Sequence, residues 1–181
     1  YKCSQLENLT IGSGLTQIPS YTFYNCTALK EVVIPGTVRS IGSYAFRGCE
    51  NLEKVTLSEG VEVVEKYAFL KASGVKYLTI PDSVTTIGEF AFRGMDKLYS
   101  VYLSTNVSYI GRMAFYGNND ATIYLEGTEI PAEWSNRWNA SYLPIVYGAV
   151  LSEDNSYVVS WTAVEGGLEN ISSFIVLSEP S

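Results

Sequence analysis

Apolar residues recur along this chain with a period of 23 residues. The clearest column consists of Phe23, Phe46, Phe69, Phe92 and Phe115. The same step separates Ile18, Ile41, Val64, Ile87 and Ile110, and it also separates Leu9, Val32, Val55, Leu78 and Val101. A fixed period of this length predicts a repeat protein, because one unit cannot bury its own apolar face whereas stacked units can.

Each unit reads L-x-x-V-x-I-P-x-x-V-x-x-I-G-x-x-A-F-x-x-C. The L-x-x-V-x-I half alternates between apolar and variable positions, which predicts a short strand. Pro35 and Pro81 follow two of these strands directly and end the ladder, because proline has no N–H to donate. At the next corner we expect glycines with positive φ, namely Gly42, Gly88 and Gly111. We expect the A-F segment to form a helical or 3₁₀ turn that directs its phenylalanine into the core.

Two stretches, "VVIPGTVRSIGSYAFRGCENL" and "LTIPDSVTTIGEFAFRGMDKL", resemble the BspA-like class of bacterial leucine-rich repeats, whose unit has 23 residues. The resemblance covers residues 6 to about 125. The sequence departs from the family pattern at Pro19 and Glu65, which stand where other units have the corner glycine. The resemblance implies a right-handed leucine-rich-repeat solenoid of about five repeats, with a parallel β-sheet on one face, short helical or 3₁₀ turns on the other and a C-terminal cap.

The chain is expected to divide into three parts. Residues 1–125 form the repeats, 126–148 form the cap, and 149–181 form an acidic β-rich tail or the start of a further module. Because Tyr1 lies in the middle of a repeat, we expect the chain to be part of a longer protein.

Within the cap, a short helix is expected to begin at Thr128 or Glu129 with Pro131 in its first turn. Trp134 and Trp138 then share one face and cover the last coil, although an aromatic platform for a sugar or a peptide stays an alternative. In the tail, "SYVVSW" and "SFIVL" are predicted strands, with a turn at Gly166-Gly167.

Composition narrows the functional classes. With 46% hydrophobic and 17% charged residues the chain is expected to fold. The net charge of −7 argues against nucleic-acid binding. No apolar run approaches the roughly 20 residues of a membrane span, so no membrane insertion is expected. The chain has no histidine, which excludes imidazole-based triads and zinc sites.

Cysteine also follows the repeat, at Cys3, Cys26 and Cys49. The column continues as Ala72, Met95 and Asn118. A buried column of small residues explains this, because Ala and Met take the place of cysteine in it. A metal cluster or a disulfide is the alternative, since neighbouring coils lie about 4.8 Å apart.

The variable positions of the predicted strands point outward and form the candidate binding surface. Tyrosine gathers there toward the C-terminal end, as Tyr77, Tyr99, Tyr102 and Tyr124. Tyrosine is enriched in protein interfaces, but it also suits exposed strands through its β-propensity. Both explanations stay open. A second column stands just before the A-F pair and is expected to serve packing: Tyr21, Tyr44, Tyr67, Phe90 and Met113.

We therefore expect a non-catalytic module, with no catalytic residues, no metal site and no cofactor. The resemblance implies a bacterial secreted or cell-surface protein of adhesion type. Its expected partner is a host or matrix protein or a glycan, bound through the sheet face. The alternative is a structural spacer that presents other modules and has no ligand of its own. The oligomeric state and the ligand stay open.

Overall fold

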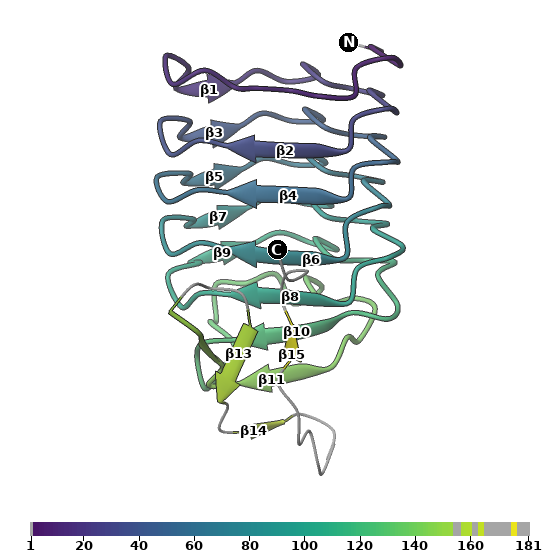
Figure 1. Cartoon of the computed structure of the whole chain (residues 1–181). Coiled ribbons are helices and arrows are strands. Elements are labelled where there is room, and N and C mark those ends of the chain that lie inside the picture. Colours follow the sequence, from purple (N-terminus) through teal and green to yellow (C-terminus); the bar gives the residue numbers. More distant parts are fainter. Residues whose placement is uncertain (1, 154–156, 161–162, 165–174, 177–181) are drawn as a thin grey trace.

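The computed structural model describes residues 2–153, 157–160, 163–164 and 175–176. The chain winds into a solenoid of stacked coils, with the N-terminus at one end (Figure 1). One side of the coils forms a row of parallel strands, here called the front sheet. Its strands are β2 (Glu31–Ile34), β4 (Lys54–Leu57), β6 (Tyr77–Ile80), β8 (Ser100–Leu103), β10 (Thr122–Leu125) and β11 (Ile145–Tyr147). The predicted solenoid with a parallel sheet on one face is confirmed.

The front sheet follows the period of the sequence. β2 pairs with β4, and β6, β8, β10 and β11 pair in that order, while β4 lies beside β6. Val32 is opposite Val55 and Ile34 is opposite Leu57, so residues 23 apart stack directly. Alternation sends these side chains into the core, where Val32 and Ile34 have no exposed surface.

A second parallel sheet lies on another side of the coils, and the sequence did not indicate it. Its strands are β1 (Gln17–Ile18), β3 (Ser40–Ile41), β5 (Val63–Val64), β7 (Thr86–Ile87) and β9 (Tyr109–Ile110), in that order. Each strand has two residues, of which the second is buried. Two residues are too few to show the alternation by which a strand is recognised in a sequence.

The third side of the coils holds the A-F segments, and here the predicted helical or 3₁₀ turns are wrong. No helix occurs among the residues that the structure describes. The segments run as turns whose backbone bonds cross between coils: Phe46 N–H donates to the Ala68 carbonyl at 2.7 Å. Because these N–H groups are satisfied by the next coil, the segment needs no helical hydrogen bonds of its own. We call this side of the solenoid the turn side.

Phenylalanine rings from the turn side fill the centre of the core. Phe46, Phe69, Phe92 and Phe115 have no exposed surface. Their rings stack with centroids 5.0 to 5.5 Å apart. The predicted phenylalanine column is therefore a continuous stack, and each ring supports the coils on both sides of it.

The corner glycines have a different role from the expected one. Positive φ is absent at Gly42, Gly88 and Gly111. A Cβ on Gly42 would lie 2.6 Å from the backbone nitrogen of Ser20, and a Cβ on Gly88 would lie 2.4 Å from that of Lys66. The prediction of positive φ is wrong: glycine is needed at these positions because the chain there closely approaches the backbone of the coil before it.

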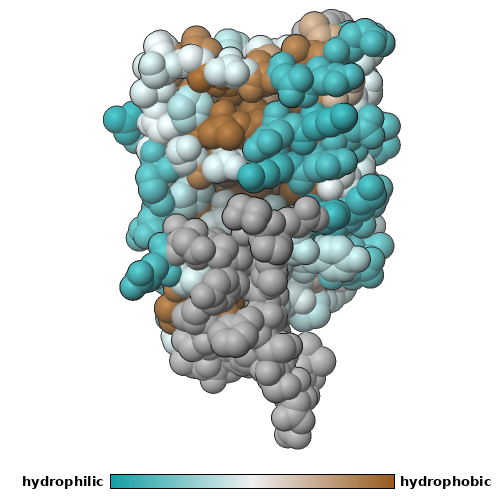
Figure 2. Space-filling view, viewed as in Figure 1, coloured by the Kyte–Doolittle hydropathy of each residue, from teal (hydrophilic) through white to brown (hydrophobic). Residues whose placement is uncertain are grey.

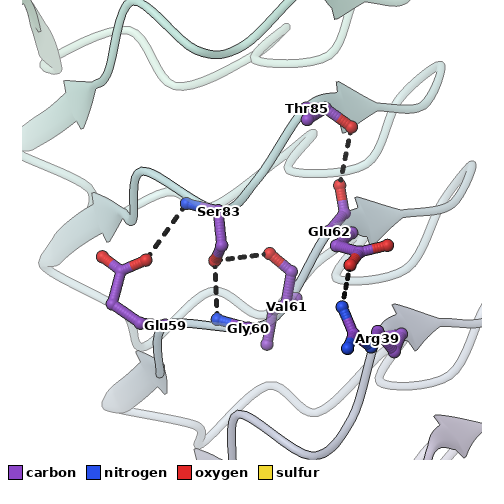
Figure 3. A network of polar contacts seen from close by, with 7 residues as sticks. All are labelled: Arg39, Glu59, Gly60, Val61, Glu62, Ser83 and Thr85. Atoms are coloured by element: carbon purple, nitrogen blue, oxygen red, sulfur yellow. Dashed lines mark hydrogen bonds and ion pairs between the residues drawn. The ribbon is translucent and has the colours of Figure 1, made fainter.

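Polar side chains connect neighbouring coils at the corner after the front strands (Figure 3). The Glu59 carboxylate accepts a hydrogen bond of 3.1 Å from the backbone N–H of Ser83. Ser83 Oγ in turn accepts from the Gly60 N–H and donates to the Val61 carbonyl, both at 2.8 Å. These contacts replace solvent at a corner where the backbone has no ladder partner.

The predicted cap covers the last coil, but without a helix. Trp134 and Trp138 are each 5% exposed, and their rings meet edge to face with centroids 4.9 Å apart. The indole N–H of Trp134 donates to the Val107 carbonyl at 2.7 Å, while Trp138 packs edge-on against Phe115. The expected short helix near Thr128 is wrong, because this segment runs as bends and turns. β11 then extends the front sheet by one strand.

The described part of the tail consists largely of short strands. β12 (Val150–Leu151), β13 (Tyr157–Ser160) and β15 (Ile175–Val176) form an antiparallel sheet, and β14 (Ala163–Val164) pairs with β11. The predicted strands in "SYVVSW" and "SFIVL" are confirmed as β13 and β15. The predicted turn at Gly166-Gly167 lies outside the described residues. The boundaries of the three predicted parts stay a prediction.

Candidate functional site

The candidate site is the outer face of the front sheet, where four tyrosines were expected to form one patch. Two of them lie together at its surface. The rings of Tyr77 and Tyr99 have centroids 6.5 Å apart and are tilted by 31°. Tyr99 is 58% exposed, and Tyr77 is half-buried at the start of β6. These two side chains form an accessible aromatic pair at one edge of the sheet.

The other two tyrosines are buried, so the prediction of exposure is wrong for them. Tyr102 is 5% exposed and Tyr124 is 3% exposed. They belong to a separate apolar cluster with Val146, Ala149 and Val158. The tail supplies Val158 from β13, which lies in front of this end of the sheet (Figure 1). A segment without the 23-residue period therefore covers the C-terminal half of the expected patch.

The burial of these phenols changes their chemistry. Desolvation raises the pKa of Tyr124 to about 12. Desolvation also raises the pKa of Tyr102, with smaller contributions from the charges of Glu126 and Asp82. Both side chains therefore stay protonated at neutral pH, and they act as packing groups beneath the tail.

The N-terminal half of the front sheet stays open. Val33 is 47% exposed, and the hydroxyl-bearing side chains of Thr56 and Thr79 are half-buried on the same face. Lys54 and Glu31 form an exposed ion pair of 3.5 Å between β4 and β2. Figure 2 shows apolar residues gathered in the upper middle of this face, beside a hydrophilic band. The open surface is thus mixed in character, with a small apolar centre and polar neighbours.

The cysteine column has no reactive character where it is buried. Cys26 and Cys49 have no exposed surface, Cys3 is exposed, and all three are free thiols. Desolvation raises the pKa of Cys26, and it raises that of Cys49 to about 12. A protonated thiol is neither a nucleophile nor a metal ligand. Among the described residues no group of three or more His, Cys, Asp or Glu side chains could hold a metal ion.

Sequence reasoning did not expect a surface on the turn side, yet an aromatic row is partly exposed there. Tyr21, Tyr44, Tyr67 and Phe90 stack face to face with centroids 4.7 to 5.0 Å apart. We call these four residues the aromatic ladder. Tyr21 is 45% exposed, whereas Tyr44 and Tyr67 are half-buried and Phe90 is 7% exposed. Packing, as predicted, is therefore only part of the role of this column. Tyr21, at the N-terminal end of the aromatic ladder, also reaches solvent.

The aromatic ladder depends on an uncommon backbone conformation. All four residues have positive φ, between 56° and 62°. Non-glycine residues rarely adopt this region, and bulky ones do so at a cost of about 1–3 kcal/mol. The conformation recurs in each coil, so the contacts between stacked rings and between coils must compensate for it.

The geometry defines the class of the protein as a leucine-rich-repeat solenoid. The model of the protein family described as "BspA type Leucine rich repeat region" matches residues 1–126, with 6 copies of the repeat. The chain belongs to the BspA-type leucine-rich repeat family, with six matched units where the sequence led us to expect about five.

Two solved bacterial structures are similar to this chain. The pneumococcal vaccine antigen PcpA matches with a TM-score of 0.54 and 24% identity, over 62% of this chain and 29% of that one. A leucine-rich repeat protein from Eubacterium ventriosum matches with a TM-score of 0.51 and 25% identity, over 55% of this chain and 27% of that one. This chain thus matches less than a third of the length of each of these two solved structures. Both similarities support the assignment of the repeat fold. No curated protein matches this chain.

The described residues also contain no helix whose length and apolar character would let it cross a membrane.

Proposed function

We propose that the chain is a non-catalytic, adhesion-type interaction module of a bacterial secreted or cell-surface protein. It binds a host or matrix protein or a glycan through the open part of the front sheet. The observation that carries the proposal is the accessible pair formed by Tyr77 and Tyr99, with ring centroids 6.5 Å apart, beside the part of the sheet that the tail leaves uncovered.

The chemistry of the open face supports this proposal. Tyrosine offers a large contact area with few rotatable bonds, so little conformational entropy is lost when a partner orders it. Thr56 and Thr79 add hydroxyl groups, and exposed Val33 adds apolar contact. Repeat scaffolds present such extended surfaces because their strands stack in register. The surface location and the adhesive role rest on the family resemblance.

The tail limits where a partner can bind. Because Tyr102 and Tyr124 lie beneath it, the surface available to a partner runs over β2, β4 and β6 and the Tyr99 edge. The proposal therefore places the contacts in the N-terminal and middle coils.

The test compares the 181-residue chain with the double variant Tyr77→Ser, Tyr99→Ser on arrays of extracellular-matrix proteins and glycans. We expect the unaltered chain to bind at least one probe and the double variant to bind it about tenfold more weakly, since hot-spot aromatic residues each contribute more than 1 kcal/mol.

The matched control is the double variant Tyr109→Ser, Tyr142→Ser, which removes two tyrosines that are 42% and 90% exposed outside the front sheet. It should bind as the unaltered chain does. Equal loss in both variants, or no loss in either, contradicts a site on the front sheet. If no probe binds the unaltered chain, the interaction module is contradicted and a spacer without its own ligand explains the fold better.

A further inference from the structure

Three arginines on the turn side lie over the rings of the aromatic ladder and its neighbours. The Arg47 guanidinium is 5.3 Å from the ring centroid of Tyr24 and 5.6 Å from that of Tyr44. Arg93 likewise lies 5.5 Å from Phe90 and 5.3 Å from Tyr116. Contact with a ring face holds a guanidinium in place while its N–H groups still reach solvent.

The third arginine joins the same group. The Arg112 guanidinium is 5.1 Å from the ring centroid of Phe90, which Arg93 also contacts. Two cations therefore share one ring near the C-terminal end of the aromatic ladder, and Arg47 lies two coils nearer the N-terminus. We call Arg47, Arg93, Arg112 and the aromatic ladder the arginine ridge.

None of these three cations forms an ion pair within the described part of the chain. Its ion pairs join Arg39 to Glu62 and Lys54 to Glu31, away from the turn side, and none involves Arg47, Arg93 or Arg112. The arginine ridge is thus a positive surface on a chain of net charge −7.

Two carboxylates lie close to the arginine ridge in the repeat. Glu65 is already engaged, because it accepts hydrogen bonds of 2.9 and 2.7 Å from the backbone N–H and the hydroxyl of Ser43. Glu89 occupies the same repeat position as Arg112, one unit earlier, and forms no ion pair with it. Glu89 is therefore an acidic group that opposes an anionic ligand here.

We propose that the arginine ridge binds a linear anionic polysaccharide whose sulfate or carboxylate groups contact Arg47, Arg93 and Arg112. This site goes beyond the front sheet and is independent of it. Arginine suits both anions, because its planar N–H groups match two oxygens at once. Since Arg47 and Arg93 are two coils apart and coils repeat every 4.8 Å, their charges are spaced by roughly 10 Å along the solenoid.

The backbone of the turn side argues against an extended peptide as the ligand. Its N–H groups already donate to the next coil, as Phe69 does to Ala91 at 2.8 Å and Phe92 to Ala114 at 2.9 Å. A peptide that adds as a strand gains affinity from free backbone groups, and these are engaged here.

The tyrosines of the aromatic ladder supply a different chemistry, a row of phenol hydroxyls between the arginines. Desolvation, followed by the nearby phenols of Tyr67 and Tyr21, raises the pKa of Tyr44, so that its hydroxyl stays protonated. Phenols donate to and accept from hydroxyl groups, which a polysaccharide carries along its whole length.

The experiment measures binding of two polyanions to the 181-residue chain by isothermal titration calorimetry. Heparin oligosaccharide supplies sulfate and polygalacturonate supplies carboxylate, and the comparison identifies which anion is preferred. We expect binding to at least one of them that weakens as salt is raised. The triple variant Arg47→Gln, Arg93→Gln, Arg112→Gln keeps the side-chain stems but removes the charges, and its Kd should rise by about tenfold.

A charge-matched control separates a site from general attraction. The triple variant Lys30→Gln, Arg39→Gln, Lys97→Gln changes the net charge equally but leaves the arginine ridge intact, and its Kd should stay within about twofold. Glu89→Gln should tighten binding, because it removes the opposing carboxylate. A gain from this surface substitution cannot be explained by misfolding.

Several results would overturn the proposal. These are an absence of binding to both polysaccharides, an equal loss in the two triple variants, and no change or a loss with Glu89→Gln. If polyglutamate or duplex DNA binds as tightly as the polysaccharides do, the ligand of the arginine ridge is an acidic peptide or a nucleic acid and not a polysaccharide. Because the front-sheet variant Tyr77→Ser, Tyr99→Ser leaves the arginine ridge intact, it should bind each polyanion as the unaltered chain does, so the two sites fail independently.

Discussion

The thiol of Cys49 donates a hydrogen bond to the carbonyl oxygen of Phe23, with 3.2 Å between sulfur and oxygen. Asn118, in the same column three units later, makes the equivalent contact: its Nδ2 donates to the Phe92 carbonyl at 2.9 Å. Both bonds span 26 residues. The column therefore does more than fill space, because cysteine and asparagine each provide a donor to the preceding coil.

Asn118→Ala should destabilise the chain strongly. Asn118 is 1% exposed, and its Oδ1 also accepts the Met95 N–H at 2.8 Å. Alanine would leave that N–H and the Phe92 carbonyl buried without these partners, at a cost of about 2–4 kcal/mol in the free energy of unfolding. Urea denaturation followed by circular dichroism measures the loss. Exposed Asn119→Ala is the control and should change stability by less than about 0.5 kcal/mol; equal effects would contradict the role given to Asn118.

Gly42→Ala should separate two coils. Its Cβ would lie 2.6 Å from the Ser20 nitrogen and 2.7 Å from the Ile18 oxygen, and backbone atoms cannot move aside as a side chain can. We expect a loss of about 1–3 kcal/mol, as for other overpacked sites. In Gly12→Ala the new methyl group meets nothing within 4 Å, so the melting temperature should hold. A Gly42 variant as stable as the Gly12 variant would contradict close approach as the reason for this glycine.

The repeated columns explain how much of the fold could be predicted. Val32, Val55 and Leu78 alternate with variable residues in every unit, and this pattern directly predicts the front sheet. The two-residue strands of the second sheet carry no such signal. The A-F segments were expected to be helical because their local sequence permits it, but bonds such as that between Phe46 and Ala68 are made with another coil.

The candidate site was harder to predict, for a related reason. Tyr102 and Tyr124 stand at outward positions of the repeat, and what covers them comes from Val158, outside the period. Arg47 and Arg93 stand 46 residues apart, two repeat units, and that spacing was visible in the sequence. What the sequence could not show was the positive φ that brings the aromatic ladder to the surface beside them.

Stability should fall in alkaline solution, and the buried thiols of Cys49 and Cys26 should start the decline. The pKa of the Cys49 thiol is raised from 9.0 to about 12 in the folded chain. The unfolded chain therefore loses this proton first, so the stabilisation is complete below pH 9 and decreases as the pH rises toward 12. Tyr124 adds a second decline above pH 10, because its pKa is raised from 10.0 to about 12.

Replacing the thiol tests this assignment. Between pH 9 and 10, where Tyr124 contributes equally to both proteins, the free energy of unfolding of Cys49→Ala should depend less on pH than that of the unaltered chain. Urea titrations across this range measure the two slopes. Identical slopes in the two proteins would contradict the assignment to Cys49.

Val158→Asp should release the tail from the front sheet while the solenoid stays folded. Val158 has no exposed surface and packs with Tyr102 and Tyr124 in a cluster separate from the main core. A carboxylate in this apolar cluster is costly unless it regains water, and the tail can provide that only by detaching. The two phenols would then be hydrated, and their raised pKa values should return toward 10.0. Spectrophotometric titration should show two more tyrosines ionising near that pH.

Val150→Asp, at a tail position that is 50% exposed, should leave the titration unchanged. An unchanged titration in Val158→Asp would mean that the tail does not control access to this half of the sheet.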